Sequence, residues 1–156
     1  MNKNAIKGAI QLEVFFDCSS PWTYLAFERL CAMSDRRGQP IDWKPILVGG
    51  VFNTVNATVY EARANPNPVK LAYYMKDMDD WARLVGIRIG RPPVFPVNSV
   101  KAMRGAFFAL DQGKLVPYAR AVFESYWGAL ADISQDSHVI AAAERAGLDG
   151  RALLDY

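Results

Sequence analysis

The sequence predicts an α/β fold that opens with a strand, a helix and a second strand and continues with helices. Apolar and polar residues alternate over residues 10–16, which is typical of a strand. Apolar residues then recur at helical spacing from Tyr24 to Met33, and residues 41–47 form a second predicted strand. Because a helix joins the two strands, we expect them to be parallel, with a right-handed crossover.

The first helix is predicted to begin at Ser20-Pro21. Proline is favoured at the first helical position because its missing N–H would have no partner there, and Ser20 is the expected N-cap. Arg36, Arg37 and Gly38 end the helix with cations and a glycine. The Ser20 hydroxyl would then face the positive end of the helix dipole, which stabilises an anion such as a ligand's thiolate. Helix capping alone is the alternative interpretation.

After the second strand, the chain is predicted to turn and then to become helical. Gly49 and Gly50 either let the backbone turn sharply toward a ligand or form an ordinary loop. Trp81 is predicted to lie in the interior of the helical part, and the proline-rich residues 92–96 are predicted to be extended. Helices are predicted over residues 68–85, 99–110, 115–130 and 137–146, and from residue 149 onward.

The predicted domain boundary follows from this change of character along the chain. Residues 1–60 form the βαβ part, and residues 61–156 form an all-helical insertion domain. A chain of 156 residues with 51% hydrophobic residues can bury a core of its own.

Charge and hydropathy exclude two classes of partner. Eighteen basic and sixteen acidic side chains leave a net charge of +2 without a basic run, so we expect no nucleic-acid binding. The sequence contains no apolar stretch long enough to span a membrane and no signal-peptide pattern. We therefore expect a cytoplasmic protein that does not bind a membrane.

The two cysteines and the single histidine do not form a recognisable site. Cys18 and Cys31 lie thirteen positions apart, which fits neither a Cys-x-x-Cys pair nor a metal site. Cys18 precedes Ser20 by two positions and is off register for a nucleophile, and Cys31 is expected to be a small buried hydrophobe. His138 lies at a predicted helix start with candidate caps around it, so we expect it on the surface. We therefore expect neither a serine-hydrolase triad nor a metal site.

Residues 16–25, Phe-Asp-Cys-Ser-Ser-Pro-Trp-Thr-Tyr-Leu, carry a family resemblance. Ser20 and Thr23 occupy the two positions that cysteines hold in a thioredoxin motif. The chain resembles the 2-hydroxychromene-2-carboxylate isomerases and kappa-class glutathione transferases, a branch of the DsbA-like thioredoxin superfamily. The resemblance continues over residues 44–53, 93–99, 102–106 and 141–148.

The resemblance implies a thioredoxin-like (DsbA-like) fold with an all-helical insertion and a glutathione cofactor. Ser20 would be the catalytic residue that donates a hydrogen bond to the glutathione thiolate. Addition of that thiolate to a conjugated aromatic-degradation intermediate, rotation and thiolate loss would isomerise the substrate. The alternatives are a kappa-like glutathione transferase or peroxidase and a truncated, non-catalytic binding module.

The same resemblance suggests residues that support the cofactor. Pro21 and Trp22 would lie beside glutathione. An asparagine that contacts glutathione is expected after the Gly-Gly pair, and both Asn53 and Asn56 are candidates, although either could be a turn residue.

Three further residues are candidates for contact with the small aromatic substrate. Lys44 would neutralise a substrate carboxylate or remain solvated at the end of its strand. Asn98 would contact ligand or cap the helix that begins near residue 99. We expect one of Trp22 and Tyr24 to line the pocket and the other to lie in the core. Tyr24 is included among the candidate substrate contacts.

The expected sheet is smaller than the resembled fold requires. In that family the chain returns after the insertion to add two strands and a helix, with a cis-proline that faces the serine. No later strand pair is predicted here, and two parallel strands leave an open edge. We therefore expect that the C-terminal strands, about 30 residues or more, are missing, or that another subunit completes the sheet in a homodimer.

Overall fold

The computed structural model describes residues 12–56 and 58–156. It opens with β1 (Leu12–Phe16), α1 (Pro21–Arg37) and β2 (Ile41–Pro45). The two strands pair in parallel, with Leu12 opposite Ile41 and Phe16 opposite Pro45, which confirms the predicted βαβ opening. The predicted start of the first strand, residues 10 and 11, lies outside the described residues.

The helices that follow include two that the sequence did not predict. α2 (Val48–Val55) begins shortly after β2, and α3 (Thr58–Ala64) comes next. Gly49 and Gly50 lie inside α2, so the expectation of a turn or loop there was wrong. Apolar residues at Val48, Val51 and Phe52 recur at helical spacing, although no residue of α2 is buried.

The long helix α4 (Pro68–Val85) has the predicted bounds. Asn67 caps it by accepting hydrogen bonds from two backbone amides, and Gly86 ends it in the left-handed region at φ 81°. The placement of Trp81 in the interior was wrong, because Trp81 is 38% exposed and lies 5.3 Å from the Arg29 guanidinium. Only a narrow face of α4 is buried, and it packs against Leu25 of α1.

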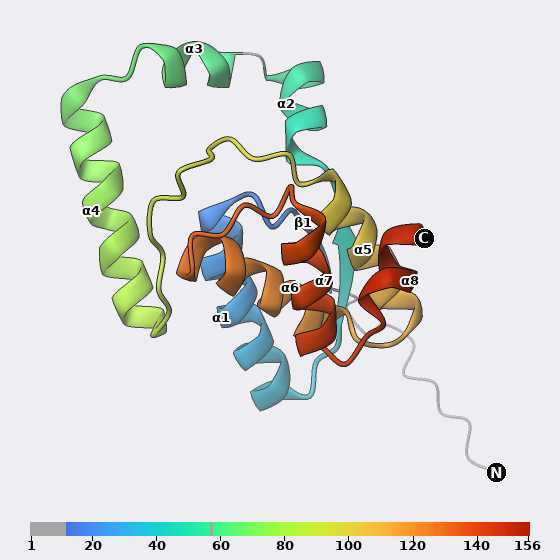
Figure 1. Cartoon of the computed structure of the whole chain (residues 1–156). Coiled ribbons are helices and arrows are strands. Elements are labelled where there is room, and N and C mark those ends of the chain that lie inside the picture. Colours follow the sequence, from blue (N-terminus) through green and yellow to red (C-terminus); the bar gives the residue numbers. More distant parts are fainter. Residues whose placement is uncertain (1–11, 57) are drawn as a thin grey trace.

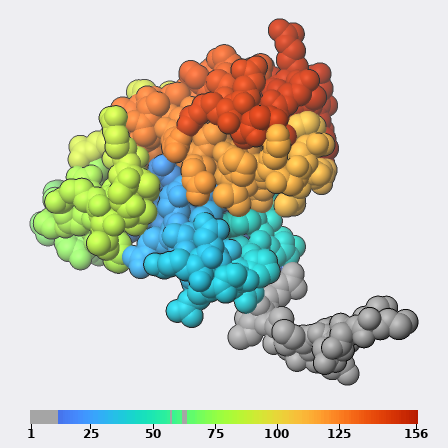
Figure 2. All heavy atoms as spheres, turned by 90° about the horizontal axis from the view of Figure 1, so that it is seen from below, coloured from blue at the N-terminus to red at the C-terminus, as the bar shows by residue number. Residues whose placement is uncertain are grey.

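The remaining helices pack against one another. They are α5 (Val100–Asp111), α6 (Leu115–Phe123), η1 (Glu124–Gly128), α7 (Asp136–Arg145) and α8 (Gly150–Asp155). α5 and α8, in gold and red, lie at the opposite end of the molecule from α4 (Figures 1 and 2). The predicted helix over residues 115–130 is present, but its last part is a π-helical turn. This turn buries Tyr126 and Trp127 side by side, and Trp127 Nε1 donates a hydrogen bond to the Cys18 carbonyl at 3.0 Å.

The main core lies between the βαβ unit and the C-terminal helices. Phe16, Phe27, Trp43 and Phe123 form its aromatic centre, with ring centroids 4.7 to 6.5 Å apart. This packing fixes the C-terminal end of β1 and the start of α1 against α6.

The buried thiols predict an alkaline loss of stability. Burial raises the pKa of Cys31 from 9.0 to about 11 and raises the pKa of Cys18 well above its ordinary value. The unfolded chain therefore releases these protons at lower pH than the folded chain, so the free energy of unfolding falls as the pH rises above the unfolded pKa. We expect urea unfolding to show this fall between about pH 8 and pH 10. A Cys31→Ala variant whose pH slope equals that of the wild type would contradict this expectation.

Candidate active site at the start of the first helix

Ser20 is the N-cap of α1, as predicted. Its backbone is extended (φ −105°, ψ 122°), and its Oγ accepts a hydrogen bond from the Thr23 amide at 3.2 Å. Within residues 12–56 and 58–156, neither the Ser20 hydroxyl proton nor the Trp22 amide meets an acceptor. The helix start therefore offers two hydrogen-bond donors at the positive end of its dipole.

A cavity of about 470 Å³ opens at this helix start. Most of its lining comes from three segments that are far apart in the sequence: the turn into α1, the first part of α2, and the segment before α5. Tyr60 of α3 and Tyr74 of α4 complete the lining. The cis peptide bond Phe95–Pro96 belongs to the third segment. The lining residues are Ser19, Ser20, Pro21, Trp22, Leu47, Val48, Gly49, Gly50, Phe52, Tyr60, Tyr74, Phe95, Pro96, Val97, Asn98, Ser99 and Val100.

Asp17 holds these three segments together. Its carboxylate is 2% exposed and accepts hydrogen bonds from the Ser19 amide (2.8 Å), the Val48 amide (2.9 Å) and the Ser99 hydroxyl (3.2 Å). Each donor belongs to a different wall of the cavity. We did not single out Asp17 from the sequence, although it is part of the Phe-Asp-x-x-Ser-Pro motif.

Trp22 and Tyr24 have different surroundings. Trp22 lines the cavity and meets Tyr74 of α4 edge to face, with centroids 5.7 Å apart. Tyr24 is buried in the core and stacks on Phe123 at 4.8 Å, and burial raises its pKa to about 12. Tyr24 therefore does not occupy the position expected of a substrate contact.

Lys44 and the two candidate asparagines do not line the cavity. Lys44 lies on the outer face of the sheet, where its ammonium group is 2.7 Å from the Asp42 carboxylate, and this hydrogen bond raises the pKa of Lys44. Asn53 is exposed on α2, and Asn56 accepts a hydrogen bond from the Thr58 hydroxyl at 2.7 Å. Because α2 replaces the expected loop, Phe52 and Gly49 line the cavity instead.

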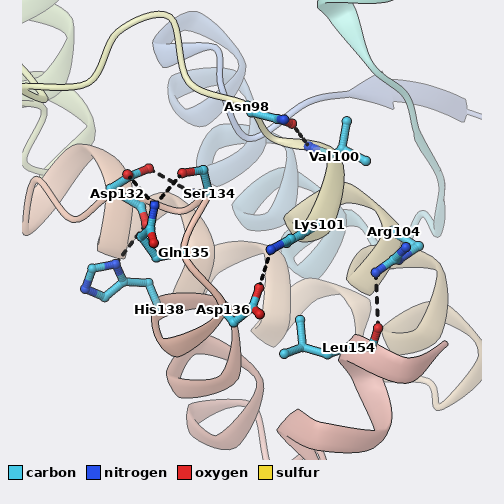
Figure 3. Close-up of polar contacts among 10 residues, drawn as sticks. All are labelled: Asn98, Val100, Lys101, Arg104, Asp132, Ser134, Gln135, Asp136, His138 and Leu154. Carbon is cyan, nitrogen blue, oxygen red and sulfur yellow. Dashed lines mark hydrogen bonds and ion pairs between the residues drawn. The ribbon is translucent and has the colours of Figure 1, made fainter.

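Asn98 lies in the cavity wall and also contacts the start of α5. Its Oδ1 accepts a hydrogen bond from the Val100 amide at 3.1 Å, at the start of α5 (Figure 3). Ser99, not Asn98, is the N-cap of α5, so Asn98 supports the helix start from one position before the cap. A contact between Asn98 and ligand stays a prediction.

Cys18 and His138 take no part in this cavity. Cys18 is fully buried, and its amide contacts the Met103 sulfur at 3.3 Å. His138 is partly buried in the first turn of α7, where Nδ1 lies 2.8 Å from the Asp132 carbonyl (Figure 3). The N-cap of α7 is Gln135, whose side chain makes no capping bond, so the expected caps around His138 were wrong.

Comparison with known proteins identifies the family. Residues 11–155 match the family model of the DSBA-like thioredoxin domain. A 2-hydroxychromene-2-carboxylate isomerase from Pseudomonas putida is 30% identical over 149 residues, which cover 90% of this chain and 68% of the relative. The chain belongs to the DSBA-like thioredoxin domain family. Its resemblance to the isomerase and kappa-class branch is thereby confirmed.

Further similarities agree with this membership. Glutathione S-transferase kappa 1 of Rattus norvegicus is 26% identical over 148 residues, which cover 88% of this chain and 62% of the relative. A solved structure of 2-hydroxychromene-2-carboxylate isomerase superposes with a TM-score of 0.71 at 27% identity, covering 92% of this chain and 69% of that one. The predicted thioredoxin-like fold is confirmed. No helix in the described part of the chain is long and apolar enough to cross a membrane.

Proposed function

We propose that this protein is a glutathione-dependent isomerase of the 2-hydroxychromene-2-carboxylate isomerase type, acting on an aromatic-degradation intermediate. The observation that carries the proposal is the free hydroxyl proton of Ser20 at the start of α1, in the wall of a cavity of ligand size. The isomerase relatives support the reaction class.

The donors at the start of α1 suit a thiolate. The Thr23 amide fixes Ser20 Oγ by donating to it, which leaves the Ser20 proton free to be donated to an anion. The Trp22 amide and the helix dipole add positive potential at the same place. When bound, glutathione would supply a thiolate that adds reversibly to the conjugated substrate and so permits rotation about a former double bond. A serine at this position also forms no mixed disulfide with that thiol.

The walls of the cavity would provide apolar and polar contacts to a bound ligand. Trp22, Phe95 and Val97 give an apolar lining against which a ligand would pack. Pro21 and Trp22 stay the proposed cofactor contacts, and Asn98 stays a proposed ligand contact. Asn53 and Asn56 do not line the cavity, so they would contact only a part of the ligand that extends outside it.

A kappa-like glutathione transferase is the second candidate, and the rat relative favours it. The cofactor site would be the same, but the thiolate would remain attached to an electrophilic product. A non-catalytic binding module would bind glutathione without turnover. The homodimer stays a prediction, and sedimentation of the purified protein would test it. The domain boundary near residue 60 also stays a prediction.

Turnover measurements distinguish these functions. We expect the purified protein to isomerise 2-hydroxychromene-2-carboxylate, followed by absorbance, only when glutathione is present, and to return the glutathione unconsumed. Stoichiometric consumption of glutathione with an electrophile would assign the transferase instead. Binding of glutathione without either reaction would assign the binding module.

A further inference from the structure

The turn that leads into Ser20 is held by two hydrogen bonds to a single peptide group. The Ser20 amide donates to the Asp17 carbonyl at 3.2 Å, so residues 17–20 form a β-turn whose middle peptide joins Cys18 to Ser19. The N–H of this peptide belongs to Ser19 and donates to the Asp17 carboxylate at 2.8 Å. Its carbonyl belongs to Cys18 and accepts from Trp127 Nε1 at 3.0 Å. Both ends of the middle peptide are therefore fixed.

Rotation of this middle peptide is the movement that the bond from Trp127 opposes. The common β-turn types differ mainly in the orientation of the middle peptide. Cys18 is fully buried, and an unpaired carbonyl in a buried place is unfavourable. Without the indole donor, a turn in which this carbonyl points elsewhere becomes favoured. Because Ser20 follows directly, the orientation of the peptide sets where its hydroxyl lies.

Trp127 lies in an unusual segment of backbone. The π-helical turn η1 closes with a hydrogen bond from the Ala129 amide to the Glu124 carbonyl at 2.8 Å. Such turns are rare and occur frequently at functional sites. Leu130, which follows, has φ 62° in the left-handed region, where a residue with a branched side chain is strained. Features of this kind persist only where surrounding contacts require them, so the position of Trp127 is under constraint.

Contacts with the segment before α5 fix this π-helical turn. The Trp127 carbonyl accepts from the Gly90 amide at 2.7 Å, and the Tyr126 hydroxyl donates to the Val94 carbonyl at 2.8 Å. Leu130 packs so closely on Gly90 that a Cβ at residue 90 would lie 2.6 Å from its side chain. Residues that follow directly supply one wall of the cavity at the helix start. The π-helical turn therefore connects that wall to the turn into α1.

We infer that Trp127 is a positioning residue for Ser20. Its indole N–H holds the Cys18–Ser19 peptide in the orientation that places the Ser20 hydroxyl at the start of α1. Trp127 does not line the Ser20 cavity, so it acts on that cavity through the peptide. The inference rests on the proposed function for the catalytic role of the Ser20 hydroxyl, and it adds a residue from the other end of the chain to that site.

Amide hydrogen exchange tests the positioning without any ligand. Trp127→Phe removes the indole donor and keeps an aromatic ring. Relative to the amides of α5, we expect the Ser19 and Thr23 amides to exchange at least about 10-fold faster, the effect of losing one hydrogen bond. Tyr118→Phe is the matched control, because the buried Tyr118 hydroxyl donates to the Ala102 carbonyl at 3.0 Å outside the cavity lining. It should leave the relative exchange of both amides unchanged.

A reporter thiol tests whether the site depends on this positioning. Ser20→Cys places a thiol at the helix start, where the dipole lowers a thiol pKa, and the pH dependence of alkylation by iodoacetamide measures that pKa. Cys18 and Cys31 are buried, so they react slowly. We expect a pKa below about 8.5, and a rise of about 0.5 or more when Trp127→Phe is added. Adding Tyr118→Phe should not change it.

The wild type provides a check that needs no variant. Rotation of the middle peptide releases the Trp127 indole N–H and the Ser19 amide together, so the indole should be protected from exchange at least as strongly as that amide. Protection of the indole more than about 10-fold weaker than that of the amide would overturn the inference.

The remaining outcomes separate this inference from the proposed function. Unchanged exchange of the Ser19 and Thr23 amides in Trp127→Phe would overturn the inference. A lowered reporter pKa that Trp127→Phe does not move would also overturn it, because the site would then not depend on the indole. Faster exchange with an ordinary reporter pKa in both backgrounds would instead refute the role of the helix start in the proposed function. Trp127 would then stand as the residue that positions the turn.

Discussion

Replacing Ser20 with alanine is expected to lower turnover on the order of 100-fold, the typical effect of removing one hydrogen-bond donor from a charge-stabilising site. The hydroxyl proton that we assign to the thiolate disappears, and the cavity walls remain. Stability should fall by only about 1 kcal/mol, because the change removes one helix-capping side chain. Steady-state kinetics and urea unfolding of the same preparation measure both effects.

Asp149→Ala is the matched control for this loss of a cap. Asp149 accepts hydrogen bonds from the Arg151 and Ala152 amides at the start of α8, outside the cavity lining. We expect a similar loss of stability with unchanged turnover. If Ser20→Ala also keeps full turnover, Ser20 is a helix cap and nothing more.

Replacing Asp17 with alanine is expected to damage both folding and binding. Three donors would lose their shared acceptor in a buried place: the Ser19 amide, the Val48 amide and the Ser99 hydroxyl. Hydrogen bonds to a charged acceptor are among the stronger ones, so we expect a loss of about 3 kcal/mol in the free energy of unfolding. Because each donor lies in a different cavity wall, glutathione affinity should also fall even where the variant is fully folded.

Asp132→Ala provides the comparison for Asp17. Asp132 also accepts a hydrogen bond from a backbone amide two residues ahead, that of Ser134, at 3.0 Å. Hydrogen bonds from the side chain and the backbone of Ser134 lower the pKa of Asp132. Asp132 is only partly buried and does not line the cavity, so its loss should cost about 1 kcal/mol and leave glutathione binding intact. Equal effects of the two replacements would show that Asp17 does not position the cavity walls.

The elements that the sequence predicted well are those whose ends are encoded locally. α1 and α4 each begin with a capping side chain before a proline and end at a glycine in the left-handed region. Such signals act over a few residues and do not depend on the rest of the fold. α2 was missed because two adjacent glycines favour a loop by local rules, although its apolar spacing is helical.

The candidate site was only partly predictable, because its walls meet through long-range contacts. Ser20 could be found from the Ser-Pro junction, since capping is local. The contact between Asp17 and Ser99 joins residues 82 positions apart, and no local pattern shows that this carboxylate is buried. For Lys44 the strand position left open whether the side chain contacts substrate or stays solvated, and the structure places it outside the cavity lining.

The measurement that tests the account most directly is the pKa of the glutathione thiol when bound to this protein. Ultraviolet absorbance of the thiolate would be followed against pH in the wild type and in Ser20→Ala. A hydrogen bond from Ser20 and the positive end of α1 both favour the thiolate, so we expect a pKa below the ordinary value of about 8.5. Ser20→Ala should return the pKa most of the way toward that value. A bound thiol that titrates in the wild type as it does in free glutathione would contradict the proposed role of Ser20 and of the helix start.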